Sequence, residues 1–109
     1  MKLFKIKDML RGWFIGDFVP SVLRTTEFEV GVLTHTKDEY WAPHHHKLAT
    51  EINVLLSGSM TVNNIQIHVG DIFVIDPNES STPRFLEDCK VLCIKTPSVI
   101  GDKYNEYKE

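Results

Sequence analysis

Two histidines and one glutamate have the types and the spacing of metal ligands. His44 and His46 are two residues apart, and Glu51 follows five residues after His46. If His44 to His46 form the end of a strand, alternate side chains share a face, so His44 and His46 point the same way and His45 points away. Glu51 is at an odd separation, so the chain must turn or bulge after His46 before this carboxylate can join the two imidazoles.

Such a set predicts a divalent transition-metal site. Two neutral imidazoles and a carboxylate suit Fe(II), Mn(II), Ni(II) or Zn(II), and they leave coordination positions open for water or a substrate. We therefore expect His44, His46 and Glu51 to bind a metal, and we expect His46 to be catalytic. The competing interpretation is that the histidines make ordinary hydrogen bonds and bind no metal.

The spacing His-x-His-x4-Glu-x6-Gly resembles the first motif of the cupin superfamily. It consists here of His44, His46, Glu51 and Gly58. A looser match follows, because the run from Gly70 to Pro77 resembles the start of the second cupin motif, in which a glycine opens a strand that ends in a proline turn. The resemblance implies an all-β fold.

In detail, the resemblance implies one cupin-type jelly-roll or β-barrel domain over residues 1–109, with its core motifs in 43–96 and a short helical or turn segment at the N-terminus. The chain departs from the family pattern at three positions. Asp38 and Glu79 stand where the pattern has small turn residues, and Thr82 stands where it has the histidine that completes the metal site. The fourth protein ligand is therefore expected to be missing.

The order of apolar runs and turn residues independently indicates an all-β chain. Strands are expected at 30–36, 51–56, 59–62, 65–69, 72–75 and 90–96, with Met9 and Leu10 in a short helix near the start. Asn63-Asn64 is a good two-residue hairpin turn, because asparagine tolerates the left-handed conformation that a type I′ turn requires. Six antiparallel strands in 109 residues close most simply as a small barrel or jelly roll.

The strand that begins with Ile52 is apolar on both faces in its second half, up to Leu56, whereas a half-exposed strand should alternate. Its outer side must therefore be covered. We expect the segment from Trp13 to Phe18 to supply part of the cover and a second copy of the chain to supply the rest, which predicts a homodimer. The polar segment 101–109 is interpreted as a surface tail.

A mixed wall is expected around the metal site. Arg84 and Asn53 are candidates to hold a polar substrate, and Phe73 is a third substrate-binding candidate. Phe85 and Trp41 are expected to add apolar surface. The remaining histidines, His35 and His68, are expected to lie outside the site, because lone histidines are usually satisfied by local hydrogen bonds.

Composition excludes several classes of partner. With 12 Lys and Arg against 15 Asp and Glu, the net charge of −3 gives no general attraction to nucleic acid or to anionic membranes. No apolar run approaches the roughly 20 residues of a membrane span, and the basic N-terminus lacks the apolar centre of a signal peptide. We therefore expect a cytoplasmic protein. Cys89 and Cys93, four residues apart on one expected strand, would lie about 13 Å apart and cannot form a disulfide.

Three functional hypotheses remain. The first is a metal-binding cupin enzyme that acts on a small polar substrate of the carbohydrate or carboxylate type, as an isomerase, lyase or dioxygenase. The second is a metal-free enzyme, since the Pro-His-x-His-Lys run is similar to that of the nucleotide-sugar ketoisomerases of the same superfamily, with His46 as general base. The third is a non-catalytic cupin that binds a ligand.

Overall fold

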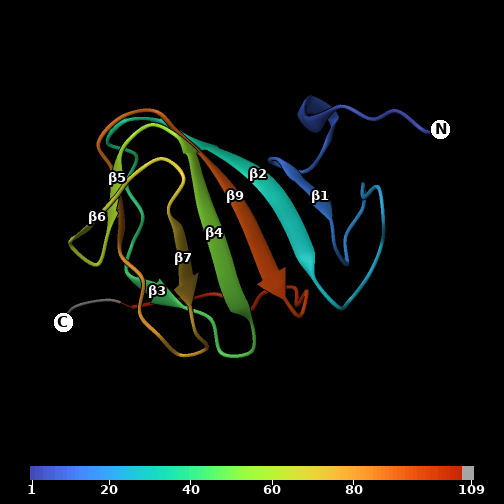
Figure 1. Ribbon diagram of the computed structural model, residues 1–109. Helices are drawn as coiled ribbons and strands as arrows, with labels where there is room; N and C mark the ends of the chain where they lie inside the picture. The colour runs from blue at the N-terminus through green and yellow to red at the C-terminus, as the bar shows by residue number, and fades with distance from the viewer. Residues whose placement is uncertain (107–109) are drawn as a thin grey trace.

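The computed structural model describes residues 1–106, and nearly all of its regular structure is β-strand (Figure 1). The elements in chain order are a 3-10 helix η1 (Ile6–Asp8), β1 (Trp13–Ile15), β2 (Glu29–His35), β3 (His44–His45), β4 (Thr50–Ser57), β5 (Met60–Val62), β6 (Ile65–Ile67), β7 (Ile72–Ile75), β8 (Pro83–Phe85), β9 (Cys89–Thr96) and β10 (Tyr104–Asn105).

The strands form two layers. One layer is a five-stranded antiparallel sheet with the order β1-β2-β9-β4-β7. The other contains the sheet β6-β5-β8 and the pair β10-β3, which a backbone bridge between His44 and Ser81 connects to the segment leading into β8. The long strands β2, β9 and β4 lie side by side across Figure 1, with β3, β5 and β6 beside them. This arrangement is a jelly roll and confirms the all-β prediction.

The predicted strands are present, and most of their ends agree within one or two residues. The Asn63-Asn64 hairpin is also confirmed, because both residues have the positive φ that a type I′ turn requires (51° and 64°). The motif glycine Gly58 has φ +93°, and a Cβ there would lie 2.3 Å from the carbonyl oxygen of Asp88. Only glycine fits this turn. The expected helix at Met9 and Leu10 is instead the single 3-10 turn η1, which ends before them.

The core lies between the layers. Leu55 is fully buried, and it packs with seven other residues that are also buried: Met60, Val62, Ile67, Ile75, Phe85, Cys89 and Val91. Both cysteines are buried and free, as expected. Since β4 alternates, the residues on either side of Leu55 lie on the outer face of the sheet, where Leu56 is 44% exposed.

The central part of the outer face of the five-stranded sheet is aliphatic, with Thr34 and Lys90 at one end and Thr50 and Thr96 at the other. Strand register places nine residues on it: Val30, Val32, Ile52, Val54, Leu56, Ile72, Val74, Leu92 and Ile94. None of them is fully buried, and Ile72 and Val74 are 67% and 49% exposed. The second half of β4 is thus apolar on both faces, as its sequence pattern indicated, and the described part of the chain leaves the outer face uncovered.

The segment from Trp13 to Phe18 does not cover that face in the way the sequence suggested. Its strand β1 extends the sheet at the edge of β2. The Trp13 ring lies over Gly31, where a Cβ would approach Cε3 of the indole to 2.8 Å, so the absence of a side chain at Gly31 gives the ring its place. Trp13 thus reaches the inner side of the sheet and lines a cavity.

Two further features concern the ends and the helices. The segment predicted as a surface tail contributes β10, which pairs with β3, up to its described limit at Glu106; Tyr107 lies outside the described residues. Within residues 1–106 no helix has the length and apolar character needed to cross a membrane.

Candidate metal and ligand site

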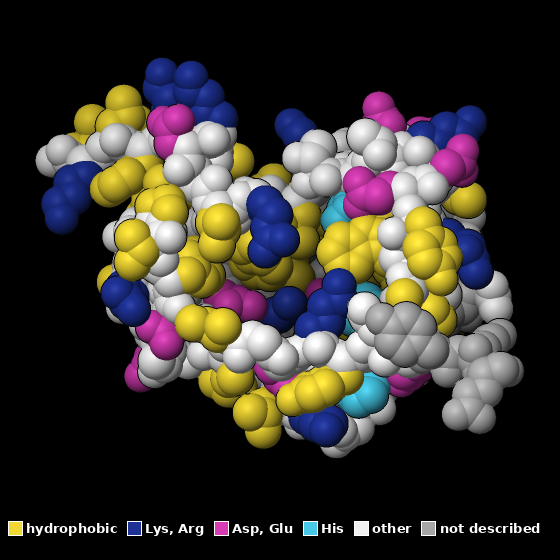
Figure 2. Space-filling view, turned by 180° about the vertical axis from the view of Figure 1, so that it is seen from behind, with side chains coloured by type: hydrophobic (Ala, Val, Ile, Leu, Met, Phe, Trp, Pro, Cys, Tyr) yellow, Lys and Arg dark blue, Asp and Glu magenta, His cyan; other side chains and the backbone are white. Residues whose placement is uncertain are grey.

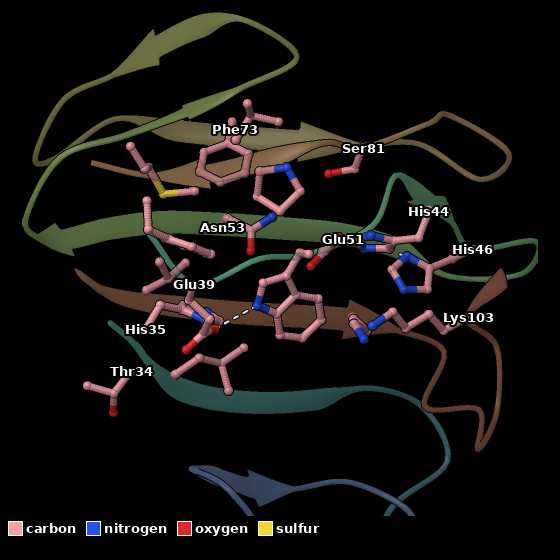
Figure 3. Close-up of a pocket in the computed structure, with 18 of the residues that line it drawn as sticks. Thr34, His35, Glu39, His44, His46, Glu51, Asn53, Phe73, Ser81 and Lys103 are labelled. Atoms are coloured by element: carbon pink, nitrogen blue, oxygen red, sulfur yellow. Dashed lines mark hydrogen bonds and ion pairs between the residues drawn. The ribbon is translucent and has the colours of Figure 1, made fainter. Parts of the chain in front are cut away.

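A cavity of about 550 Å³ opens between the two layers. Five of the sequence-predicted site residues line it: His44, His46, Glu51, Asn53 and Phe73 (Figure 3). Trp41 and Phe85 line it too, as expected. Figure 2 shows a hollowed face in which Lys and Arg side chains lie beside histidines and apolar side chains.

A loop held by Asp102 brings the two halves of the ligand motif together. The backbone N–H groups of Lys47, Leu48 and Ala49 all donate to the Asp102 carboxylate, at 2.9 to 3.3 Å. Burial alone would raise the pKa of Asp102, but these three hydrogen bonds outweigh it and hold the pKa below its ordinary value. The turn that the odd spacing between His46 and Glu51 required is thus built around a buried carboxylate.

His44, on β3, and His46, directly after this strand, both line the cavity. Their ring centroids are 5.5 Å apart. His44 Nδ1 donates to the carbonyl oxygen of Ala42 at 3.0 Å, so the lone pair of His44 resides on Nε2. Burial lowers the pKa of both His44 and His46, and Lys95 lowers that of His46 further. Both imidazoles are therefore neutral near pH 7, the form that ligates metals.

His46 and Glu51 face each other. Oε2 of Glu51 lies 3.8 Å from Nδ1 of His46. Oε1 of Glu51 accepts a hydrogen bond from Sγ of Cys93 at 3.3 Å. Burial, followed by the charge of Glu51, raises the pKa of Cys93 well above its ordinary value, so the thiol stays protonated and acts as a donor. Cys93 thus lies beneath the site and supports Glu51.

The donor types fit a divalent transition metal. His46 Nε2 is buried and has no hydrogen-bond partner, and it is the only side-chain nitrogen or oxygen of this kind found in residues 1–106. An orphaned buried polar atom costs about 1–3 kcal/mol, a cost that a metal ion would remove. The donor atoms lie farther apart than the ligands of a closed metal centre. Among the described residues, no three His, Cys, Asp or Glu side chains are spaced to hold an ion.

The structure corrects the position of the expected fourth ligand. Alternation along β8 and the residues before it directs Ser81, Pro83 and Phe85 into the cavity. Thr82 does not line the cavity, and its backbone exchanges hydrogen bonds with Asn63. Ser81 therefore occupies the place opposite His44 that the motif spacing gave to Thr82, and the expected position was off by one residue.

The same alternation separates Arg84 from the other substrate-binding candidates. Arg84 is exposed and lies opposite Thr61 of β5. The structure does not bring its side chain to the cavity. Asn53 and Phe73, in contrast, are cross-strand partners on β4 and β7 and both face inward.

A second group of polar residues in the cavity wall was missed in the sequence. Glu39 Oε2 accepts a hydrogen bond from Trp41 Nε1 at 2.6 Å and lies 2.7 Å from Nδ1 of His35. Burial raises the pKa of Glu39, but the hydrogen bonds from Trp41, His35 and Thr36 outweigh it and lower the pKa overall. His35 therefore lies in the cavity wall and not outside it. Trp41 was expected to supply apolar surface only, so its hydrogen bond to Glu39 was not predicted.

Three cationic residues of the cavity wall were also missed: Arg11, Lys95 and Lys103. Lys95 is the cross-strand neighbour of Glu29 and Glu51, a relation that becomes visible only once the strand register is known. The other two histidines lie as expected. His45 faces away from the cavity and stacks on Tyr104, and His68 is exposed.

Comparison with known proteins identifies the fold. No protein-family model and no curated protein sequence matches the chain. Among solved structures, a protein with a double-stranded β-helix domain from Klebsiella pneumoniae is 20% identical, with a TM-score of 0.70 over 98% of this chain and 93% of that one. Proteins described as cupins, from Shewanella frigidimarina and Bacteroides fragilis, are similar too. The chain has a cupin fold.

Two further cupin-fold neighbours have descriptions that name an activity or a metal. The DMSP lyase DddQ from Ruegeria pomeroyi is 16% identical, with a TM-score of 0.71 over 87% of this chain and 50% of that chain. The bacterial pirin YhhW from Escherichia coli, in complex with nickel(II), is 18% identical, with a TM-score of 0.65 over 81% of this chain and 39% of that chain. At these identities the likeness shows the fold alone.

Proposed function

We propose that this protein is a metal-dependent cupin enzyme that binds one divalent transition metal ion, Fe, Mn, Ni or Zn, through His44, His46 and Glu51. Its substrate is a small polar molecule of the carbohydrate or carboxylate type. The observation that carries the proposal is the buried, unpartnered Nε2 of His46 in a cavity that Glu51 and His44 share.

The fold neighbours support this proposal. One of them is a lyase and another is described with nickel(II), so this fold combines with lyase activity in one protein and with metal binding in another. The cavity volume lies within the usual range for sites that bind small molecules. Its wall also combines aromatic surface with a few polar groups, which is typical of such sites.

A bound divalent ion supplies Lewis-acid polarisation of a substrate oxygen. The chain's own residues do the rest. Asn53 is 4% exposed and reaches the cavity from β4, where its amide can donate to and accept from a polar substrate. Phe73 and Trp41 give the substrate flat apolar surfaces and exclude water around it. Asp102 keeps His46 and Glu51 in place through the loop between them.

Calorimetric titration with Zn²⁺ and Ni²⁺ tests the ligand assignment. The wild-type protein, without a tag and after treatment with a chelator, is expected to bind with about one ion per chain. His46→Ala is expected to lose tight binding. His68→Ala is the matched control, because His68 is exposed and does not line the cavity. Equal affinity in His46→Ala and wild type contradicts the proposal.

A separate outcome would favour the metal-free alternative. Turnover of a nucleotide-linked keto sugar that resists chelators, tolerates Glu51→Gln and fails in His46→Asn identifies His46 as a general base instead of a metal ligand.

We further propose that two copies of the chain form a homodimer through the outer face of the five-stranded sheet. Nine aliphatic residues on four adjacent strands form a contiguous apolar surface there. Surfaces of this kind normally mark an interface, and a two-fold pairing buries the same face of both copies.

A further inference from the structure

We propose that Lys103, Lys95 and Arg11 form an anion-binding subsite in the cavity, and that the ligand carries a carboxylate group. This proposal rests on the proposed function in so far as both place the ligand in the same cavity. It narrows the substrate class from the carbohydrate or carboxylate type to small organic acids, and it assigns a role to three residues outside the metal-ligand motif.

The charge of the cavity wall supports the proposal. Arg11, Lys95 and Lys103 face two carboxylates, those of Glu39 and Glu51. Both carboxylates are held in place by other residues. Glu39 is hydrogen-bonded at the His35 side of the cavity, and Glu51 accepts from Cys93 and lies against His46. The cavity wall therefore has three cationic side chains against two carboxylates, and a bound divalent ion would add further positive charge.

Lys103 is held over the cavity without a carboxylate partner of its own. It forms no ion pair in the structure of residues 1–106, and its Nζ lies 4.0 Å from the centroid of the Trp41 ring. Figure 3 shows it beside His46 at the end of the cavity that contains Glu51. Asp102, the neighbouring residue, is fixed by the loop that it caps, so the backbone that bears Lys103 is held in place.

Lys95 is only weakly neutralised. Its Nζ lies 3.9 Å from Oε1 of Glu29, at the outer limit of an ion pair, while Oε2 of Glu29 accepts a shorter hydrogen bond of 2.9 Å from Ser98. The Lys95 side chain is 20% exposed, and it lies 5.1 Å from the ring centroid of Trp13. Each lysine thus lies over one tryptophan face and keeps N–H donors free for an anion.

The electrostatic repulsion between Lys95 and Lys103 favours an anion bound between them. Burial, followed by the charge of Lys95, lowers the pKa of Lys103. Two like charges around one cavity cost free energy, and an anionic group bound between them removes that cost and adds charge-assisted hydrogen bonds. The two lysines come from β9 and from the segment before β10, so the fold places them together although the sequence separates them.

The test uses malonate, with neutral malonamide of matched shape and inorganic phosphate as comparison probes, on the chelator-treated protein. Trp13 and Trp41 are the only tryptophans of the chain, so their two indole N–H signals in NMR report directly on the subsite. Malonate is expected to shift both signals with a millimolar Kd, phosphate to bind more weakly, and malonamide to cause no shift.

Variants locate the binding. Lys103→Met is expected to weaken malonate binding about tenfold or more, and Lys95→Met to do the same. Lys90→Met, an exposed lysine on the same strand β9 that does not line the cavity, is the matched control and is expected to bind as the wild type. Lys103 is itself exposed, so its replacement leaves the core intact.

Three results overturn the proposal: equal binding of malonate and malonamide, unchanged malonate affinity in Lys103→Met and Lys95→Met, or phosphate binding tighter than malonate. Zn²⁺ titration of the same samples separates this proposal from the metal assignment. Zinc binding without malonate binding removes the subsite and leaves the metal site. Malonate binding without zinc binding removes the metal site and leaves the subsite.

Discussion

The carboxylate of Asp102 accepts a hydrogen bond of 2.9 Å from the backbone N–H of Ala49, which is 53 positions away in the sequence and two residues before Glu51. Through this bond and its counterparts to Lys47 and Leu48, a residue near the C-terminus sets the path of the chain between His46 and Glu51. Asp102 is therefore a positioning residue for the candidate metal site.

Asp102→Asn is expected to destabilise the protein by about 2 kcal/mol, because the neutral amide has one acceptor oxygen where the carboxylate had two and turns an N–H donor toward other donors. Thermal or denaturant unfolding monitored by circular dichroism measures the change. Asp38→Asn makes the same chemical change at an exposed turn, so it is the matched control and should leave stability nearly unchanged.

The lowered pKa of Asp102 should make the stability of the protein depend on pH. The folded-state pKa of Asp102 lies below its ordinary value of 3.8, so its contribution to stability is complete above that value. The contribution is lost as the pH falls below 3.8 and through the folded-state pKa. Unfolding measured as a function of pH should therefore show a smaller loss of stability in acid for Asp102→Asn than for the wild type. Parallel curves for the two proteins would show that Asp102 is not responsible.

Ser81→His is expected to raise the affinity for Zn²⁺ about tenfold or more, because Ser81 faces the cavity opposite His44 and an imidazole there can complete a four-ligand site. Thr82→His is the matched control and should leave zinc affinity unchanged, since Thr82 does not line the cavity. Calorimetry decides between them. A gain for Thr82→His and none for Ser81→His would restore Thr82 as the position of the missing ligand.

Gly31→Ala is expected to displace the Trp13 ring, since a Cβ at Gly31 would lie 2.8 Å from it. Overpacking of this kind costs about 1–3 kcal/mol. Tryptophan fluorescence should shift to longer wavelength as the ring becomes exposed, and unfolding measurements should show the loss of stability. Gly101→Ala provides a comparison without a side-chain clash, because a Cβ at Gly101 would have no neighbour within 4 Å, although its positive φ adds local strain. An unchanged fluorescence spectrum in Gly31→Ala would contradict the packing of Trp13.

Sedimentation at micromolar concentration is expected to show a dimer, in contrast to the 12.5 kDa of one chain. Val74→Lys, on the aliphatic outer face of the sheet, should shift the equilibrium to monomer. Val19→Lys replaces a valine that is also exposed but lies outside this face, and it should leave the dimer intact. A monomeric wild-type protein would rule out the proposed interface.

Local patterns in the sequence predicted much of the fold. Alternation, turn residues and the Asn63-Asn64 hairpin depend on neighbouring residues only, and the structure confirms them. The two-residue strand β10 was not predicted, because two residues carry no periodic signal and pair only through tertiary contacts. A strand end at His44 was considered only because it gives His44 and His46 a common face.

The same distinction applies to the site. The spacing of His44, His46 and Glu51 identified a cluster that the structure places in one cavity. Lys103 was missed because the segment that bears it has the composition of a polar tail. Tertiary contacts bring it to the cavity, namely the hydrogen bonds of Asp102 and the pairing of β10 with β3. Arg84 was selected for its chemistry, but strand alternation, set by a register that the sequence did not reveal, turns it outward.

Metal analysis tests most directly whether His44, His46 and Glu51 hold a metal ion. Tag-free protein is loaded with Zn²⁺, dialysed exhaustively and measured by elemental analysis beside Glu51→Gln and His46→Ala. We expect about one ion per chain in the wild type and little in either variant, because a three-ligand site that loses one ligand no longer binds tightly. Equal metal content in all three proteins, or none in the wild type, would contradict the assignment of these residues as metal ligands.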